Sequence, residues 1–281
     1  MKYKLLLLVF LSLCGSARAQ KQLLVLHTND THSCIMPLSK NLADTMLADR
    51  GGYLRRLAAI QAERAKDPDL LLFDSGDFSQ GSAYYTMFKG DVEVGLMNRM
   101  GYDAATIGNH EFDFGLDNMA RIFRQATFPI VCSNYDFTGT PVEGLVKPYI
   151  ILKRKGVKIG VFALAPEMDG LVTKENCAGV KYLDPAQTAL SMATMLKEKK
   201  RCDLVICLSH LGWNMGPLVD DGKMIAGSRN IDLVLGGHSH TYLTELQWSP
   251  DMDGRLVPVD QNGKHAVFVG RMLLTLNKGK K

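Results

Sequence analysis

The sequence predicts an α/β fold, because short apolar runs alternate with helical patterns from one end of the chain to the other. Several of the apolar runs end in polar clusters of similar character. There is no internal repeat, no low-complexity linker and no second composition regime. About 260 residues after a leader can bury one large core, so we expect one domain.

The expected elements follow one another with short connections. The early strands are expected at 22–27, 70–74, 104–107 and 129–131, and the early helices at 52–66, 92–100 and 115–125. The runs 149–153 and 157–164 flank Lys155-Gly156 and predict a hairpin. Pro185 is expected to open a helix that ends near Lys200, because proline suits a first helical position. Strands at 204–208 and 232–235 follow, and the tail from Leu243 is expected to be antiparallel.

The first residues have the pattern of a signal peptide. Lys2 and Lys4 precede the apolar stretch 5–13, which is well short of the ~18 apolar residues of a spanning helix. Ala17-Arg18-Ala19 offers a small-x-small cleavage site, so we exclude residues 1–19 from the fold. A lipid anchor on Cys14 is the alternative, which the bulky Leu13 disfavours. We expect export to the periplasm or the exterior, with no transmembrane segment.

Charge and cysteine content exclude several classes of function. Without the leader, 30 basic residues face 29 acidic residues, so the mature chain carries about +1 and predicts no surface for a nucleic acid polymer. Five cysteines remain, an odd number without a CxxC pair: Cys34, Cys132, Cys177, Cys202 and Cys207. Neither a full disulfide framework nor a thiolate metal site is predicted, and we expect these thiols to behave as small apolar side chains.

Polar clusters follow the apolar runs directly, where open α/β sheets bind their ligands. Five of the seven histidines fall in these clusters. The clusters are Asn29-Asp30-Thr31-His32, Asp74-Ser75-Gly76-Asp77, Gly108-Asn109-His110-Glu111, Ser209-His210 and Gly236-Gly237-His238-Ser239-His240.

Each cluster alone is weak evidence, because Asn and Asp favour ordinary turns and a single histidine is usually a hydrogen-bonded structural residue. Five clusters in this order are much harder to explain as turns. Together they offer carboxylate, amide and imidazole donors, a set that suits Zn, Mn or Fe. The donors suffice for two divalent ions if one carboxylate bridges them.

These motifs resemble the calcineurin-like metallophosphoesterases, and among them the 5′-nucleotidase family of exported enzymes. The resemblance runs from about Leu23 to the stretch Gly270-Arg271-Met272-Leu273. The motifs that carry it are His27-Thr28-Asn29-Asp30-Thr31-His32, Arg50-Gly51-Gly52, Ser75-Gly76-Asp77, Gly108-Asn109-His110-Glu111-Phe112-Asp113 and Gly237-His238-Ser239-His240. The resemblance implies a four-layer αββα sandwich, with residues 20–281 forming the amino-terminal catalytic domain of that family.

The resemblance also assigns roles to residues. Asp30, His32 and His240 would hold one metal, Asn109, His210 and His238 would hold the second, and Asp77 would bridge them. His110 and Asp113 would form the catalytic pair, and Asn109 and His110 would contact the substrate. We expect His27 and His265 to be structural, and Trp213 to anchor its loop rather than line the pocket.

The chemistry can be argued from physical principles. Phosphate monoesters hydrolyse so slowly unaided that enzymes accelerate them by up to ~10²¹-fold. Two cations ~3.5–4 Å apart can bind a shared hydroxide that attacks phosphorus while they neutralise the phosphoryl oxygens. His110, oriented by Asp113, is the candidate that protonates the leaving alkoxide. The sequence therefore predicts a metal-dependent phosphoric ester hydrolase, with nucleotides as the expected substrates.

One departure from the family concerns the substrate. Nucleotidases of this family usually carry a second, carboxy-terminal domain that supplies aromatic residues for the base and arginines for the phosphate, and nothing in this chain resembles it. Either a separate polypeptide supplies that domain, which we slightly favour, or the chain acts alone on smaller phosphate esters.

Other functions remain open at this point. A cyclic-nucleotide phosphodiesterase, a nucleotide-sugar hydrolase or a thiosulfate-ester hydrolase would use the same site. A non-catalytic metal-binding subunit is the alternative from a different class, although an intact ligand set with His110 and Asp113 argues against it.

Overall fold

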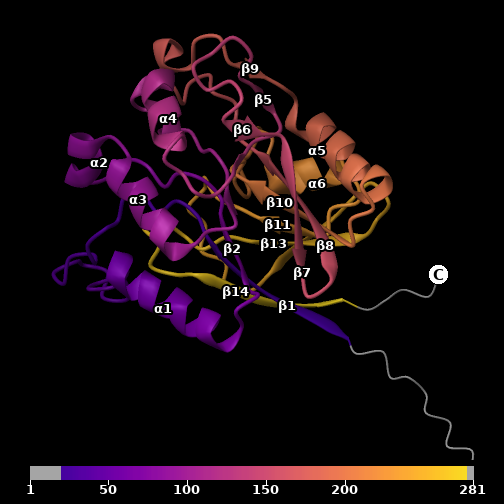
Figure 1. Cartoon of the computed structure of the whole chain (residues 1–281), viewed down its shortest axis with the longest axis horizontal. Helices are drawn as coiled ribbons and strands as arrows, with labels where there is room; N and C mark the ends of the chain where they lie inside the picture. Colours follow the sequence, from indigo (N-terminus) through magenta and orange to yellow (C-terminus); the bar gives the residue numbers. More distant parts are fainter. Residues whose placement is uncertain (1–19, 277–281) are drawn as a thin grey trace, which may run out of the picture.

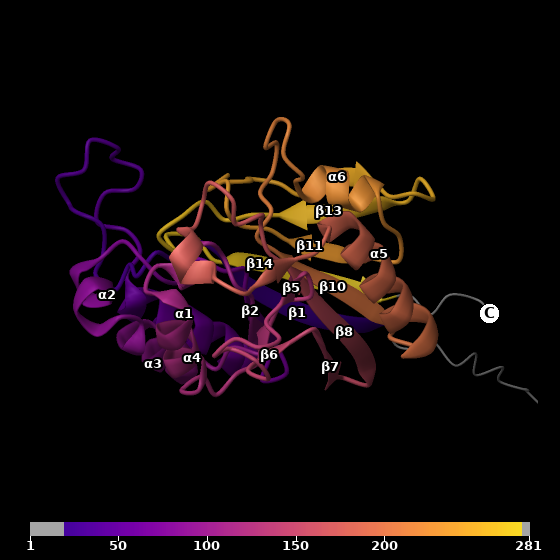
Figure 2. The same ribbon diagram turned by 90° about the horizontal axis from the view of Figure 1, so that it is seen from above.

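The computed structural model describes residues 20–276. The predicted leader at 1–19, with Cys14, lies outside the described residues. Two six-stranded sheets are stacked face to face, and helices cover their outer faces (Figures 1 and 2). Among residues 20–276, no helix has the length and apolarity to cross a membrane.

Most strands of both sheets run parallel, and antiparallel strands lie at one edge of the first sheet and at both edges of the second. The first sheet has the order β14 (Gly270–Leu276), β1 (Lys21–Thr28), β2 (Leu71–Asp74), β3 (Ala104–Ala105), β4 (Ile130–Val131) and β6 (Val146–Lys147). The second has the order β12 (Gln247–Pro250), β13 (Leu256–Asp260), β11 (Leu233–Leu235), β10 (Leu204–Ser209), β8 (Val157–Leu164) and β7 (Tyr149–Arg154). A small third sheet pairs β5 (Tyr135–Asp136) with β9 (Lys181–Tyr182).

The helices fall into two groups, one for each large sheet. The first group is α1 (Tyr53–Lys66), α2 (Ala83–Phe88), α3 (Asp91–Met100) and α4 (Gly115–Phe123), with a short 3₁₀ turn η1 (His110–Phe112) before α4. The second group is α5 (Pro185–Thr194), its continuation as the π-helical turn η3 (Met195–Lys199), and α6 (Asp221–Ala226). A 3₁₀ turn, η2 (Lys174–Cys177), lies between the groups in the chain.

Three separate layers of buried apolar side chains account for the stacking. Successive residues of β1 alternate between two of them, because side chains along a strand point to opposite faces. Leu24 and Leu26 pack with α1, α3 and α4, while Leu23 and Val25 pack between the two sheets. A third cluster joins the second sheet to α5 and α6. The order helix, sheet, sheet, helix confirms the predicted αββα sandwich.

The two central sets of parallel strands bring their carboxyl ends to one side of the molecule. β1, β2, β3 and β4 run parallel in the first sheet, and β8, β10, β11 and β13 do so in the second. The predicted hairpin is confirmed as the antiparallel pair β7 and β8. Lys155 and Gly156 form its turn with φ of 48° and 69°, the left-handed values of a two-residue type I′ turn.

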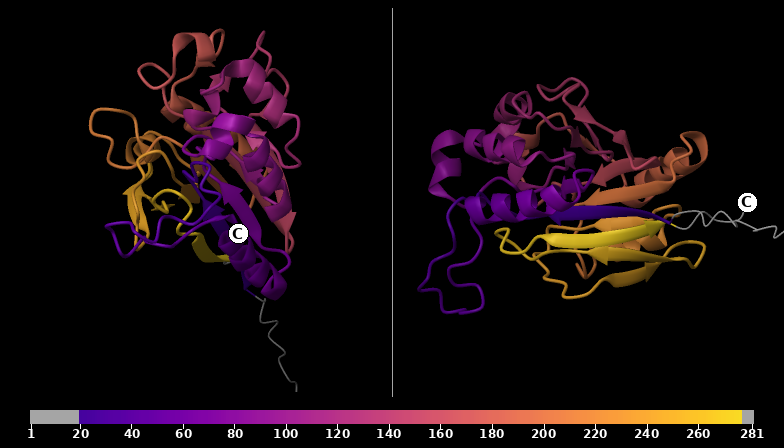
Figure 3. Two further views of the ribbon diagram at one scale, coloured as in Figure 1. Left: turned by 90° about the vertical axis from the view of Figure 1, so that its left-hand side faces the viewer. Right: turned by 60° about the horizontal axis from the view of Figure 1, so that its bottom comes forward.

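The tail differs from the expectation in one respect. β12 pairs antiparallel with β13, and β14 pairs antiparallel with β1, as predicted. β13, however, also pairs with β11, and this pair is parallel. β13 therefore extends the parallel centre of the second sheet. In the right-hand view of Figure 3, β1 in indigo and β14 in yellow lie side by side.

Two helices were not anticipated from the sequence. α2 and α6 have six residues each, which is too short for a 3.6-residue period to be recognised. Capping side chains begin both helices instead. The Ser82 hydroxyl accepts hydrogen bonds from the amides of Tyr84 and Tyr85, and the Asp220 carboxylate accepts one from the amide of Lys223. The five cysteines of the described chain are free thiols; Cys132, Cys202 and Cys207 are buried as expected, whereas Cys34 and Cys177 are partly exposed.

A core substitution tests the layer between the sheets. Ile206 on β10 is completely buried there, so Ile206→Ala should lower the free energy of unfolding by about 2–5 kcal/mol. Leu54→Ala on α1 is the matched control, because Leu54 is 76% exposed and its loss should change that free energy by less than about 0.5 kcal/mol. Urea unfolding followed by circular dichroism measures both, and equal effects would contradict the assigned layer.

Candidate metal centre

The backbone turns sharply where the ligand candidates follow the strands. Five of these residues have positive φ: Asp30 (48°), His32 (42°), Asp77 (54°), His238 (73°) and His240 (55°). Such values are uncommon outside glycine and cost free energy, so they are maintained only where the surroundings fix them. Here they direct side chains from both sheets toward one another.

Carboxylates and imidazoles meet in three overlapping groups. The groups are Asp30, His32 and His240; His32, Asp77 and His110; and Asp77, His210 and His238. Within each group the potential ligand atoms lie within 4.8 Å of one another. The groups come from the ends of β1, β2, β10 and β11 and from the segment after β3. The second group shares His32 with the first and Asp77 with the third, so it joins the other two.

Backbone amides hold the two carboxylates in place. The amide of His238 donates to both oxygens of Asp30, at 3.1 and 2.9 Å, and the Asn29 side-chain amide donates to Asp30 Oδ2 at 2.6 Å. The amide of His110 donates to Asp77 Oδ1 at 2.9 Å. Each carboxylate therefore has a fixed orientation before any ligand binds.

Glu111 fixes the turn that carries Asp77. Its completely buried carboxylate accepts hydrogen bonds from the amides of Asp77 at 3.0 Å, Ser79 at 3.1 Å and Gly108 at 2.6 Å. Burial and the nearby charge of Asp77 raise the pKa of Glu111 to about 7. Glu111 belonged to a predicted polar cluster, but the sequence assigned it no role.

Several buried polar atoms at this site have no hydrogen-bond partner within the described chain. They are His32 Nδ1, Asn109 Oδ1 and His210 Nε2. His210 Nδ1 lies 2.6 Å from the carbonyl oxygen of Ser75, to which it must donate, so Nε2 is the ring nitrogen that faces the carboxylates, 3.1 Å from Asp77 Oδ2. Unpaired buried lone pairs are costly unless something binds them. These residues therefore fit divalent cations.

The pKa values of two neighbouring imidazoles move in opposite directions. Burial lowers the pKa of His210, but the charges of Asp77 and Asp30 outweigh burial and raise it to about 10. Burial and the neighbouring His210 lower the pKa of His238 to about 4. Adjacent rings that compete for positive charge in this way cannot both be protonated, whereas one cation between them would satisfy both.

His110 and Asp113 lie at the rim of the cluster. His110 Nδ1 is 3.2 Å from both oxygens of Asp113, and the His110 ring is 5.4 Å from the His32 ring. The His110 side chain is 31% exposed, unlike those of His32 and His210. Burial lowers the pKa of His110, but the hydrogen bond to Asp113 and the charge of Asp77 outweigh burial, so the pKa lies above its usual value.

The other histidines and Trp213 occupy different positions. His27 is completely buried and bonds Asp260 at 2.9 Å, away from the ligand groups, in accord with a structural role. Trp213 packs against the core beside α5 and α6, as a loop anchor would. His265 lies at the site, 5.9 Å from His32 between ring centroids, with its amide donating to the carbonyl of Asp30 at 2.7 Å. No strand precedes His265 directly, so its position could not be predicted from the sequence.

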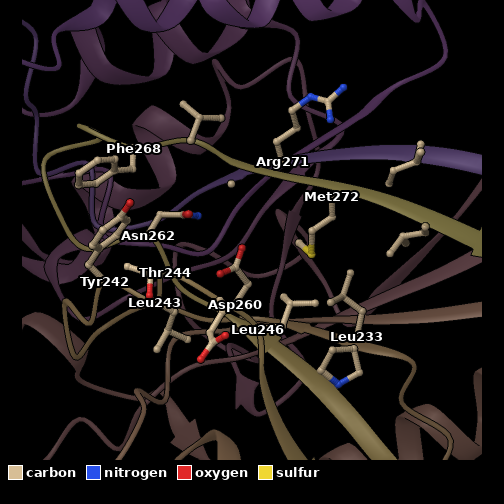
Figure 4. A pocket seen from close by; sticks show the side chains of 16 residues that line it. Leu233, Tyr242, Leu243, Thr244, Leu246, Asp260, Asn262, Phe268, Arg271 and Met272 are labelled. Atoms are coloured by element: carbon tan, nitrogen blue, oxygen red, sulfur yellow. The ribbon is translucent and has the colours of Figure 1, made fainter.

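A separate cavity, distinct from the metal centre, lies next to Asp260, the hydrogen-bond partner of His27. It has a volume of about 500 Å³ and is lined by β14 and residues 242–246 (Figure 4). Asp260 and Asn262 point into it, and Tyr242 stacks on Phe268 at 4.0 Å. Asn262 connects the cavity to the metal-ligand candidates. Its backbone amide donates to Asn29 Oδ1, and the Asn29 side-chain amide donates to Asp30 Oδ2.

Comparisons with known proteins agree with this geometry. The calcineurin-like phosphoesterase family matches residues 23–242. Human 5′-nucleotidase is 30% identical over 292 residues, which cover 97% of this chain and 50% of the human protein. The chain thus spans about half the length of the 5′-nucleotidases that it matches.

Two solved structures are similar as well. The 5′-nucleotidase precursor from Thermus thermophilus is 28% identical with a TM-score of 0.83, over 92% of this chain and 52% of that one. The calcineurin-like phosphoesterase YfkN from Bacillus subtilis is 26% identical with a TM-score of 0.75, over 93% of this chain and 87% of that one.

A glycine substitution tests whether the ligand groups hold metal. A Cβ at Gly108 would overlap Asp77 Oδ1 and lie 2.7 Å from His210 Nε2, so Gly108→Ala should displace both side chains. We expect metal affinity to fall by roughly 10–100-fold, as for other losses of ligand support. Gly95→Ala on α3 is the control, because a Cβ there meets no atom within 4 Å. The measurement is the metal content of each variant after equilibrium dialysis against buffered Zn²⁺. An unchanged metal content in Gly108→Ala would contradict the assignment of these groups as metal ligands.

Proposed function

The chain belongs to the calcineurin-like phosphoesterase family, and from that premise we propose that it is a two-metal hydrolase of phosphate esters that acts on nucleotides. The observation that carries the proposal is the convergence of three ligand groups joined through His32 and Asp77. Nucleotides are proposed because the relatives that match nearly all of this chain are named 5′-nucleotidases. Those relatives are about twice as long as this chain, so nucleotide hydrolysis by this chain is itself proposed.

The groups support two metal positions, and Asn109, which belongs to none of them, is added from the family resemblance. Asp30, His32 and His240 would hold one cation, and Asn109, His210 and His238 would hold the other. Asp77 would serve both, since it shares one group with His32 and another with His210 and His238. When bound, a pair of divalent cations would neutralise phosphoryl oxygens and lower the pKa of water enough for it to attack phosphorus. Zn, Mn and Fe all suit this donor set.

His110 is proposed to protonate the leaving group. Its Nδ1 is engaged by Asp113, so Nε2 is the nitrogen left to face a substrate. The 3₁₀ turn η1 fixes the ring, because the amide of His110 bonds Asp77 and its carbonyl accepts from the Tyr85 hydroxyl at 3.2 Å. The same turn thus links the proton donor to the proposed bridging carboxylate. Asn109 and His110 would contact the substrate from this turn.

Two further parts of the proposal rest on sequence reasoning. Export rests on the signal-peptide pattern of residues 1–19. Contacts to the nucleotide from outside the described residues rest on the greater length of the relatives, of which this chain covers about half. Size-exclusion chromatography of the purified chain tests the second part, and full nucleotidase activity in a monomer peak would exclude a required partner.

Substitution of His110 separates a proton donor from a metal ligand. His110→Ala should lower kcat by roughly 10²–10⁴-fold with unchanged metal content, because only proton transfer is lost. Asp113→Asn should lower kcat less, since the ring remains but loses its carboxylate. His265→Ala is the matched control, because it removes another imidazole near His32, and we expect less than a tenfold change. Loss of metal together with activity in His110→Ala would identify His110 as a ligand instead.

A substrate screen tests the function itself. The protein is stripped with a chelator, reloaded with Zn²⁺ or Mn²⁺, and assayed for phosphate release. We expect no activity in the stripped protein, and the highest kcat/KM with nucleoside 5′-monophosphates after reloading. Faster hydrolysis of cyclic nucleotides or nucleotide sugars would favour the alternative phosphoesterases. Metal binding without hydrolysis of any ester would indicate a non-catalytic subunit.

A further inference from the structure

The Asp30 carboxylate turns one oxygen, Oδ1, toward the imidazoles of the candidate metal centre. Oδ1 lies 3.4 Å from His240 Nε2 and 3.8 Å from the Nε2 atoms of His32 and His210. The Nε2 atoms of His32 and His240 are 2.9 Å apart. A cation among Oδ1 and these two nitrogens would receive a lone pair from each, so Oδ1 is the oxygen placed to bind it.

The other oxygen of Asp30, Oδ2, is enclosed by protein groups. The Asn29 side-chain amide donates a hydrogen bond to it at 2.6 Å. The His238 backbone amide donates to it at 2.9 Å and lies 3.1 Å from Oδ1. A Cβ at Gly237 would lie 3.1 Å from Oδ2, so the backbone after β11 also passes close to this oxygen. Two donors and a backbone wall leave Oδ2 without a free approach for a cation.

The Asn29 side chain is itself fixed by its neighbours. Its Nδ2 also donates to the Gly263 carbonyl at 2.8 Å, and its Oδ1 accepts from the Asn262 backbone amide at 2.9 Å. A backbone amide can only donate and a carbonyl can only accept, so these partners determine which end of the Asn29 amide is nitrogen. Asn29 is 1% exposed, so turning its amide would leave buried polar groups unpaired. The N–H group is therefore held against Asp30 Oδ2.

The number of carboxylate oxygens that bind a cation affects which cation fits. Zn²⁺ prefers tetrahedral sites with few ligands, whereas Mn²⁺ favours octahedral sites rich in oxygen. A carboxylate that offers only one oxygen keeps the ligand number low. A carboxylate free to offer both oxygens raises the ligand number and suits the larger ion. A hydrogen bond that occupies Oδ2 therefore bears on metal selectivity.

We propose that Asn29 is a positioning residue that makes Asp30 bind through Oδ1 alone, and that it thereby favours Zn²⁺ over Mn²⁺ in the position shared by Asp30, His32 and His240. Asn29 acts through Asp30 and does not touch the metal. The proposal rests on the proposed two-metal function and deepens it, because the donor set by itself suits Zn, Mn and Fe alike.

Two substitutions separate the bond of Asn29 to Asp30 from its bonds to the loop at 262–263. Asn29→Ala removes both. Asn29→Asp keeps an oxygen that can accept from the Asn262 amide, but it has no N–H group for Asp30. Dissociation constants for Zn²⁺ and Mn²⁺ are measured on the full chain by competition with a chromophoric chelator. The charge added by Asn29→Asp acts on both ions alike, so the ratio of the two constants is the readout.

Both variants should lose selectivity for Zn²⁺. We expect the preference for Zn²⁺ over Mn²⁺ to fall by roughly 10–100-fold, the range for loss of a hydrogen-bond partner of a metal ligand. The visible spectrum of the Co²⁺-loaded protein gives a second readout. Tetrahedral Co²⁺ absorbs much more strongly than octahedral Co²⁺, so a second oxygen from Asp30 should weaken the absorption in both variants.

A second buried asparagine provides the matched control. Asn134 is completely buried, and its side-chain amide bonds the backbone of Ala165 and no ligand candidate. Asn134→Asp should therefore keep the wild-type selectivity and spectrum. Thermal melting verifies that each variant is folded. If Asn29→Ala does not fold, Asn29→Asp decides alone, because a mere loop anchor predicts wild-type selectivity for it.

Three outcomes would count against these proposals. Wild-type selectivity in Asn29→Asp, with loss only in Asn29→Ala, would make Asn29 a loop anchor and overturn its positioning role. Unchanged selectivity and spectrum in both variants would overturn that role as well, while leaving the hydrolase intact. Failure of the wild-type chain to bind either ion would instead refute the proposed function, on which the role of Asn29 rests.

Discussion

Buried carboxylates and imidazoles meet where the strand ends of the two sheets converge, and their need for charge compensation governs the structure around them. Asp30 and Asp77 are almost completely inaccessible to solvent, as are His32 and His210. Ionised groups in such surroundings are costly unless they are paired and hydrogen-bonded. The amides of His238 and His110 supply part of the compensation. Buried polar atoms without a hydrogen-bond partner in the described chain, including His32 Nδ1 and Asn109 Oδ1, leave room for positive charge.

The backbone accepts strain to satisfy that need. Left-handed conformations at Asp30, His32 and Asp77 cost about 1–3 kcal/mol each, and glycines allow the segments to approach one another. A Cβ at Gly237 would lie 2.9 Å from both the His210 ring and the Ser75 carbonyl, so only glycine fits between the two sheets at this point. The surrounding sandwich, with three buried apolar layers, provides the stability that keeps these turns in place.

The sequence predicted most of this arrangement because the polar clusters directly follow apolar runs. The cluster after β1 and the cluster after β11 are adjacent in the sequence to strands whose burial is evident, so their meeting at one end of the sheets could be inferred. His265 could not be placed, since the loop that carries it is positioned by contacts between distant residues, such as the hydrogen bond from the His265 amide to the Asp30 carbonyl. α2 was missed because six residues show no period, and its position depends on packing between distant residues, with the Tyr85 ring 5.1 Å from the Phe114 ring. The parallel pairing of β13 depends on a crossover that no local pattern records.

The pairing of β14 with β1 has a consequence for how the protein acquires its shape. Lys21 is registered opposite Leu276, so the strand nearest the start of the described chain obtains its neighbour on one side only from the last described residues. Contacts between such distant positions form slowly, because a very long loop must close first. Until that closure the edge of β1 stays open, and everything between the two strands must be synthesised before the first sheet can be completed.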